Sequence, residues 1–213
     1  MSTAPAATTA ATYTIDPAHS GAGLKIKHLM VAYVRGGFGR VTGDVIFDPT
    51  NPANSKIQAS IDATTLHTHD EKRDAHVKGA DFLDTAKYPT ITFVSKKVTP
   101  DGNNRWKIVG DLTLHGVTKE VTLNVESAGA EAKDPWGNLR TGAEATTVLK
   151  RRCFLPNRGS CKTDRITDDS HTIAIFIRRK FNQKIPCSNL WVMKDFIKRI
   201  NRARRNLCSL ELL

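Results

Sequence analysis

Apolar and polar residues alternate along much of the chain up to residue 150, and this two-residue period is typical of half-buried β-strands. The clearest run is residues 105–114, where Trp106, Ile108 and Leu112 fall on one face and charged residues fall on the other. The same period predicts further strands from Tyr13 onward and at residues 22–28, 34–49, 56–63, 89–99, 118–127 and 139–149.

Glycines and turn residues indicate how these strands are joined. Gly36, Gly37, Gly39 and Gly43 lie inside one predicted strand and indicate bulges or sharp coiling, which closing a sheet into a barrel requires. We therefore predict an all-β, extended antiparallel fold of about eight strands. A sandwich fits the same strand count, and the glycines favour the barrel. Tight turns are expected at residues 48–54, 100–104, 115–116 and 134–137.

A polar segment from residue 65 to residue 87 interrupts the alternation, and a short helical connector is expected near residues 70–87. Polar groups at one end of an apolar site fix the orientation of a ligand. Arg73 and His76 in this connector, with His28 at the end of its strand, are candidates for binding a ligand head group. The alternative is that Arg73 pairs with neighbouring carboxylates and backbone and only holds the connector together.

The charge of the chain is unevenly distributed. The net charge is +11, yet residues 1–149 hold 16 Lys and Arg against 16 Asp and Glu, whereas residues 150–213 hold 16 against 5. All four cysteines follow Lys150. We expect a disordered leader over residues 1–12, a β-barrel domain over 13–177, and a basic, partly helical or disordered extension over 178–213.

The N-terminal residues contain no Lys or Arg and no apolar run, which is unlike a secretory signal. No apolar stretch reaches the roughly 18 residues that a transmembrane helix needs. A cytoplasmic protein without a transmembrane segment is therefore expected, and its four cysteines are expected to be reduced thiols. Their spacings match no zinc-binding pattern.

Five separated segments occur in an order that resembles the YceI family of polyisoprenoid-binding, lipocalin-like proteins. They are YTIDPAHS at 13–20, IKHLMV at 26–31, DEKRDAHVKGADFLDTAKYPTITF at 70–93, GDLTLHGVTKEVTL at 110–123 and AKDPWG at 132–137. The resemblance covers about residues 12–150. It implies a lipocalin-like β-barrel with a long apolar tunnel for an isoprenoid or fatty-acyl-like lipid, no established reaction and no cofactor. It also implies that two copies can pair, although no residue decides this.

The sequence departs from the family pattern after Lys150. Residues 168–177 alternate and are expected to supply the strand that closes the barrel, whereas residues from 178 onward have no counterpart in the family. An abrupt change to Cys and Arg is what a reading-frame change or a fused extension produces. A frameshifted, impaired member of the family is therefore one alternative for this chain.

The apolar residues of the predicted inner face are the candidates for lining the ligand tunnel. A solid core is the alternative, because a barrel of about eight strands is either filled by side chains or holds one ligand. If the barrel holds a ligand, burial of apolar surface drives the binding. The tunnel candidates are Leu24, Ile26, Phe38, Ile91, Phe93, Trp106, Ile108, Leu112, Leu114, Val121 and Leu123.

Other chemistry has weaker support in the sequence. His67 and His69 with nearby carboxylates resemble a metal-binding set, but they lack the spacing of a zinc site, and we expect no metal. Asp74 and His76 are candidates for acid–base catalysis, but no spacing in the sequence defines a catalytic site, and we expect no enzyme. The chain lacks a Ser-centred elbow and a Gly-rich phosphate loop.

The basic C-terminal extension supports an alternative function. Leu190, Met193 and Ile197 fall on one stripe of a predicted helix that also carries many Lys and Arg. Such a helix suits an anionic membrane surface or non-specific binding to nucleic acid. The competing interpretation is a tail without a function. The leading hypothesis remains a carrier or sequestering protein for a long-chain amphiphile.

Overall fold

The structure is a computed structural model that describes residues 10–28, 31–48, 50–127, 131–135, 137–150, 153–154, 176–178 and 181–183. The chain separates into two units, of which the first ends at Gln183. The second unit, Lys184–Leu213, lies outside the described residues, as do residues 1–9 of the predicted leader 1–12 and most of residues 151–175. Ala11 and Thr12 of the predicted leader belong to a strand. The predicted helix in the basic extension therefore stays a prediction.

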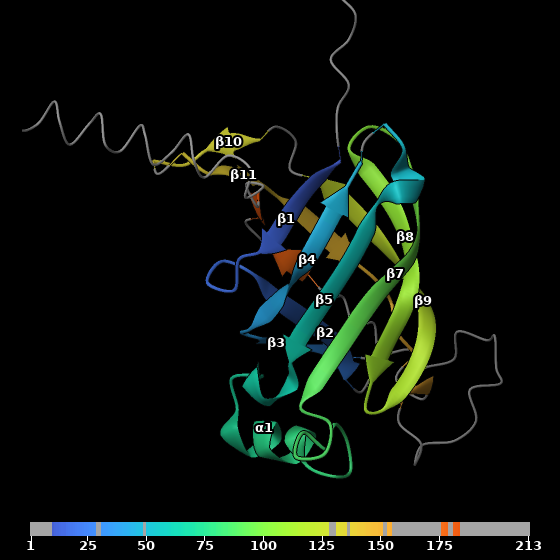
Figure 1. The fold of residues 1–213 in the computed structure, drawn as a ribbon. Coiled ribbons are helices and arrows are strands. Elements are labelled where there is room, and N and C mark those ends of the chain that lie inside the picture. The colour runs from blue at the N-terminus through green and yellow to red at the C-terminus, as the bar shows by residue number, and fades with distance from the viewer. Residues whose placement is uncertain are drawn as a thin grey trace, which may run out of the picture. The chain divides into compact units, whose positions relative to one another are not determined.

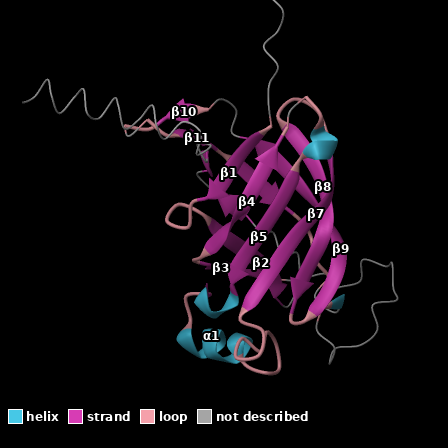
Figure 2. Ribbon diagram, in the orientation of Figure 1, coloured by secondary structure: helices cyan, strands magenta, loops and turns pink. Residues whose placement is uncertain are grey.

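The described part of the first unit consists mainly of antiparallel strands in two sheets (Figures 1 and 2). The four-stranded sheet has the order β13 (Phe176–Arg178), β2 (Gly21–His28), β3 (Ala32–Phe38) and β6 (Leu66–His67). The ten-stranded sheet has the order β10 (Ala132–Lys133), β11 (Leu139–Thr141), β14 (Phe181–Gln183), β1 (Ala11–Ile15), β4 (Val41–Phe47), β5 (Lys56–Asp62), β7 (Thr90–Pro100), β8 (Arg105–Leu114), β9 (Val117–Ser127) and β12 (Ala143–Thr146).

Among the described residues, helical structure is confined to connections between strands. The α-helix α1 (Glu71–Lys78) lies at one end of the strands, and the 3₁₀-helices η1 (Pro52–Asn54) and η2 (Ala63–Thr65) flank β5 (Figure 2). The predicted all-β antiparallel fold with a helical connector near 70–87 is confirmed.

The ten-stranded sheet curls so far that its two ends are joined by one short segment. β11 and β12 stand near opposite ends of the strand order, but only Gly142 separates them in the chain. Consecutive Cα atoms are about 3.8 Å apart, so the two ends of the sheet come within a few ångströms of each other. The sheet is therefore a half-barrel that turns toward closure.

Two predicted strands are each divided in the structure. The predicted strand 34–49 becomes β3 and β4, which belong to different sheets and are separated by Gly39 and Arg40. The predicted strand 139–149 becomes β11 and β12, which pair with β14 and β9 respectively. Alternation shows which residues face inward. It does not reveal that the chain changes its pairing partner at a glycine.

Gly43 shows why this sheet contains glycine inside a strand. Its φ of 149° lies in a region that L side chains rarely adopt. A Cβ atom at this position would also lie 2.9 Å from the Cα of Ala59 on β5. Glycine therefore allows β4 and β5 to approach closely where the sheet coils, as the sequence predicted.

The β8–β9 hairpin is closed by the two residues that the sequence assigned to a tight turn. His115 has φ 52° and Gly116 has φ 70°, and Leu114 pairs with Val117 across the turn. Positive φ at both central residues defines a type I′ turn, whose twist suits antiparallel strands. The ring of Tyr88 packs over this turn, 4.7 Å from the ring of His115, so the end of the connector contacts the β8–β9 hairpin.

Residues beyond Lys150 contribute strands to the barrel. In β13, Phe176–Arg178 pair with Gly21–Gly23 of β2, so this strand covers the end of the segment 168–177 that was expected to close the barrel and extends one residue beyond it. β14 follows and pairs with β1 on one side and β11 on the other. Residues 168–175 of the predicted closing strand lie outside the described residues.

Cys153 differs from the sequence-based expectation. It is disulfide-bonded, so the prediction that all four cysteines are reduced thiols is wrong at this position. Structural disulfides persist mainly in oxidising compartments. The other three cysteines lie outside the described residues.

Candidate ligand-binding site

The inner face of the curled sheet is a continuous apolar surface. All the predicted tunnel residues belong to one hydrophobic cluster, although they come from five different strands of the two sheets. Eight of them are buried, whereas Ile26, Trp106 and Val121 are partly buried and pack against the cluster. The alternation therefore places these side chains correctly, and their contact with a ligand stays a prediction.

A small apolar cavity lies within this cluster. Its volume is about 20 Å³, and a cavity needs roughly 10–15 Å³ to hold one water molecule. The cavity walls are side chains from β5, β7, β8, β9 and the segment that begins at β12. The lining residues are Ala59, Ile61, Thr92, Phe93, Leu112, Leu123, Ala145 and Thr147.

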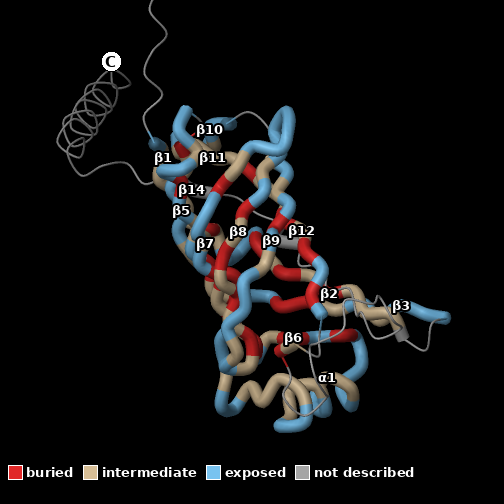
Figure 3. The backbone as a smooth tube through the Cα atoms, turned by 90° about the vertical axis from the view of Figure 1, so that its right-hand side faces the viewer, coloured by how far each residue is buried: buried red, intermediate tan, exposed pale blue. Residues whose placement is uncertain are grey.

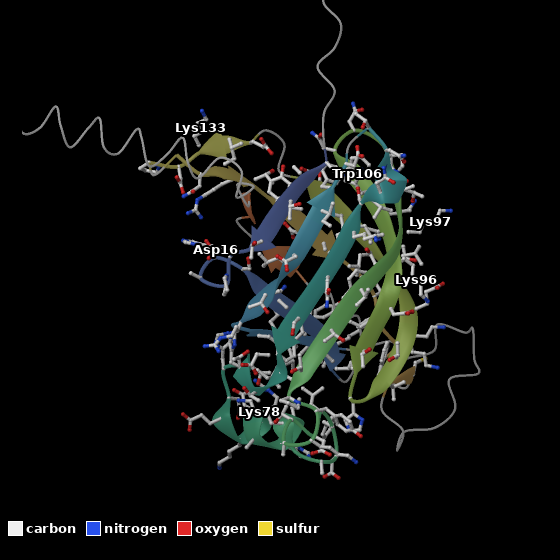
Figure 4. The ribbon with its side chains drawn as sticks, viewed as in Figure 1. Asp16, Lys78, Lys96, Lys97, Trp106 and Lys133 are labelled. Carbon is white, nitrogen blue, oxygen red and sulfur yellow. The ribbon has the colours of Figure 1, made fainter. Side chains whose placement is uncertain are left out.

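Residues at the ends of the inner face have distinct contacts. Trp106 lies at the end of β8 that is remote from α1 (Figure 4), and its ring meets that of Phe47 edge to face at 5.0 Å. At the connector end, Val77 and Leu83 are partly buried against the core cluster. The apolar surface therefore extends along the strands from Trp106 toward the connector.

The outer face of the sheet has the opposite character. Lys96 and Lys97 project outward from β7 (Figure 4), and Lys96 forms ion pairs with Asp111 at 2.6 Å and Glu120 at 3.3 Å. These groups are solvent-exposed, so the pairs contribute little stability. Because charged side chains stay in water and apolar side chains are removed from it, the apolar face of the sheet becomes the inner face of the barrel.

Helix α1 begins at a standard cap. The carboxylate of Asp70 accepts a hydrogen bond from the backbone N–H of Arg73 at 3.0 Å. Acidic Glu71 and Asp74 lie in the first turn and basic His76 and Lys78 near the end, which suits the helix dipole. This explains why a sequence without an apolar stripe is helical here.

Arg73 and Asp74 both bind Thr68, which is 5% exposed and precedes the helix. The guanidinium of Arg73 donates from Nε to Thr68 Oγ1 at 2.7 Å and from Nη2 to the Thr68 carbonyl at 2.6 Å. The carboxylate of Asp74 accepts from Thr68 N at 2.7 Å and from Thr68 Oγ1 at 2.5 Å. Hydrogen bonds from Thr68 lower the pKa of Asp74. These contacts match the alternative that Arg73 holds the connector.

The other two head-group candidates lie apart from this network. His76 is exposed on α1, and its ring meets that of Phe82 edge to face at 4.9 Å. His28 pairs with Ala32, four residues along β3 from Gly36, beside which Thr68 lies. Four strand residues span about 13 Å, so the register does not group His28 with Arg73. A common head-group site for His28, Arg73 and His76 stays a prediction.

Asp74 and His76 do not form an acid–base pair across the helix surface. They are two positions apart on α1, and residues at this spacing point to different sides. Asp74 is also engaged by Thr68. His67 and His69 stack edge to face at 5.4 Å, and the part of the chain that the structure describes holds no cluster of three or more metal-ligating side chains.

The sequence analysis missed a polar network that connects two distant segments. Arg140 donates from Nε to Asp134 at 2.6 Å and from Nη1 to Asp16 at 3.2 Å, and His19 meets Asp16 at 2.8 Å. Burial raises the pKa of Asp16, but hydrogen bonds from His19, Ala18 N and Arg140 outweigh it and the net shift is downward. Arg140 and Asp16 are 124 residues apart in the chain, so no local sequence signal reveals their contact.

Fold and site together define the class of the protein. A curled antiparallel sheet with an apolar inner face and a helical connector at one end is a lipocalin-like half-barrel. The chain belongs to the YceI-like family, because the family model described as the YceI-like domain matches residues 13–178. The match continues past residue 150, where the resemblance seen in the sequence ends.

Individual relatives agree with this assignment. A UPF0312 protein of Vibrio cholerae is 41% identical over 152 residues, which are 70% of this chain and 80% of that protein. The crystal structure of the YceI protein of Campylobacter jejuni is 32% identical with a TM-score of 0.60, covering 75% of this chain and 91% of that one.

A more distant solved structure shares the fold. The polyisoprenoid binding domain from Saccharophagus degradans is 15% identical with a TM-score of 0.55, and the match covers 83% of this chain and all of that one. No helix among the described residues is both long and apolar enough to span a bilayer.

Proposed function

We propose that this protein binds a long-chain amphiphile, an isoprenoid or fatty-acyl-like lipid, against the inner face of its barrel and carries or sequesters it. The continuous apolar cluster of the inner face carries this proposal. Each Å² of apolar surface removed from water contributes about 25 cal/mol, so a long chain binds there with few polar contacts. The polyisoprenoid binding domain of S. degradans, which has the same fold, adds support.

Binding requires the inner side chains to move apart. The cavity of about 20 Å³ holds about one water-sized group, which is much less than a lipid chain. Small residues, Ala59 and Ala145, line it together with the larger Phe93 and Leu112. We infer that a lipid enters by displacing Phe93 and its neighbours, and that Ala59 and Ala145 leave space for the lipid chain.

A lipid-loading experiment tests the proposal. Delipidated protein is titrated with a fluorescent acyl or polyprenyl probe, and saturable 1:1 binding is expected. Ala145→Leu, which fills the cavity, should weaken binding at least tenfold, whereas Ala75→Leu on the exposed side of α1 should not. Absence of saturable binding, or equal binding by both variants, would contradict the assigned site.

The cellular compartment in which the protein binds lipid is a second part of the proposal. A cytoplasmic location stays a prediction, and the disulfide at Cys153 argues against it. Fractionation of cells with compartment markers, together with alkylation of free thiols before lysis, distinguishes a cytoplasmic location from an oxidising compartment. Full alkylation of Cys153 in cells would favour the cytoplasm.

A further inference from the structure

The β2–β3 hairpin has one cationic face. Lys25 pairs with Arg35 and Lys27 pairs with Tyr33 across the two strands. Directly opposite residues of an antiparallel pair, and residues two apart on one strand, point to the same side of the sheet. Lys25, Lys27, Tyr33 and Arg35 therefore share a face, which we call the hairpin face.

The hairpin face carries positive charges in a segment that lacks acidic residues. The sequence from Gly21 to Arg40 contains no Asp or Glu. Among the residues that the structure describes, none forms an ion pair with Lys25, Lys27 or Arg35. Like charges directly opposite across a strand pair are destabilising. An external anion would remove that cost at the Lys25–Arg35 pair.

The hairpin also exposes apolar and aromatic side chains. Val31 is 86% exposed and Tyr33 is 54% exposed, and the Nζ of Lys25 lies 4.1 Å from the centre of the Tyr33 ring. The hairpin projects from the body of the barrel, and the residues near its tip are exposed (Figure 3). Within the part of the chain that the structure describes, Val31, Tyr33 and Arg35 are exposed and can meet a flat surface.

We propose that the hairpin face docks on an anionic lipid bilayer. Tyr33 is suited to the headgroup level because its ring is apolar and its hydroxyl is polar, and Val31 inserts beside it. The ammonium and guanidinium groups of Lys25, Lys27 and Arg35 contact lipid phosphates, each adding to the attraction of a negatively charged leaflet. Exposed apolar groups flanked by cations fit a bilayer better than an acidic protein surface.

A second copy of the chain fits this face less well. A twofold-symmetric dimer places the same patch of each copy against the other. The uncompensated cations of both hairpins would then face each other, which costs free energy. The docking proposal rests on exposure and charge, so it stands even if the barrel carries no lipid.

Hydrogen exchange measured by mass spectrometry on the full, unmodified chain tests the proposal locally. Vesicles of phosphatidylcholine with phosphatidylglycerol in equal parts should slow exchange in peptides that cover residues 25–35. Vesicles of phosphatidylcholine alone should not. Slowing that is confined to the basic extension would overturn the proposal. Slowing that rises with protein concentration in the absence of vesicles would identify a second copy as the partner and overturn it as well.

Matched charge variants separate the hairpin from the basic extension. Lys25→Gln, Lys27→Gln and Arg35→Gln together should weaken binding to the anionic vesicles by about 100-fold when the hairpin dominates. Lys72→Gln, Lys97→Gln and Lys119→Gln remove the same charge from exposed positions elsewhere and should change binding much less. Equal losses in the two variants would overturn the proposal. Circular dichroism checks that both are folded, and Val31→Ser provides a second test without a change of charge.

Discussion

The ring of Phe93 on β7 lies over the backbone of Gly110 on β8, where any side chain larger than hydrogen would meet it. A Cβ atom at Gly110 would be 2.6 Å from Cζ of Phe93 and would also meet the carbonyl of Val94. Phe93 lines the inner cavity, so this glycine permits a large aromatic side chain at the centre of the proposed lipid site.

Replacement of the glycine should therefore destabilise the fold. Overpacking of a filled core typically costs about 1–3 kcal/mol, and Gly110→Ala should lower the free energy of unfolding by an amount in this range. Urea unfolding followed by circular dichroism measures it. Gly39→Ala, where a Cβ meets nothing within 4 Å, is the control. A Gly110→Ala variant as stable as the wild type would contradict the described packing.

Truncation of Phe93 should have two separable effects. Phe93→Ala should cost about 3–5 kcal/mol of stability in the empty protein because it leaves a cavity in the core. Bound lipid should restore part of this loss, because a ligand that binds only the folded state stabilises it. Val94→Ala on the outer face, where the side chain is 48% exposed, is the control. Thermal melts with and without the acyl probe measure both effects, and a cost that lipid does not reduce would argue for a solid core.

Much of this inner face is predictable from alternation alone. Leu112 and Leu123 face inward because every second residue of an antiparallel strand does so. The division of residues 139–146 at Gly142 is not predictable in this way, because it depends on which strands the two halves meet. The register between strands is a property of the whole sheet and not of a local pattern.

The side-chain contacts of the connector show the same limit. The composition of the segment indicates that Arg73 and Asp74 pair with something, but it does not identify Thr68 as the common partner. Thr68 is neither charged nor part of an alternating run, so nothing in the sequence distinguishes it. Its burial and its four hydrogen bonds to these two side chains become evident only in the folded chain.

Acid should weaken the Thr68–Asp74 contact. The pKa of Asp74 is lower in the folded protein, chiefly because the Thr68 hydroxyl donates to its carboxylate. The stability it contributes is therefore present above the unfolded-state pKa of about 3.9 and is lost as the pH falls through the lower folded-state value. Asp74→Asn should reduce the decline of stability between about pH 5 and pH 2. Asp81→Asn, an exposed carboxylate in the same connector, is the control. An unchanged pH profile in Asp74→Asn would contradict this role.

Removal of Arg140 should be more damaging than removal of an exposed arginine. Arg140→Gln leaves Asp134 and Asp16, which are 6% and 13% exposed, without their shared cation. Arg105→Gln breaks only an exposed pair with Glu126 at 3.7 Å. Differential scanning calorimetry should show a fall in Tm for Arg140→Gln several times that for Arg105→Gln. Equal effects would indicate that the network does not join the two segments.

The lipid that accompanies the protein during purification tests the central claim most directly. Native mass spectrometry of the intact protein, followed by organic extraction and analysis of the extract, should reveal one long-chain amphiphile per barrel that exchanges with an added acyl or polyprenyl probe. The Ala145→Leu variant should carry less of it. A folded protein that co-purifies with no lipid and takes up none from the probe would contradict a lipid-binding barrel.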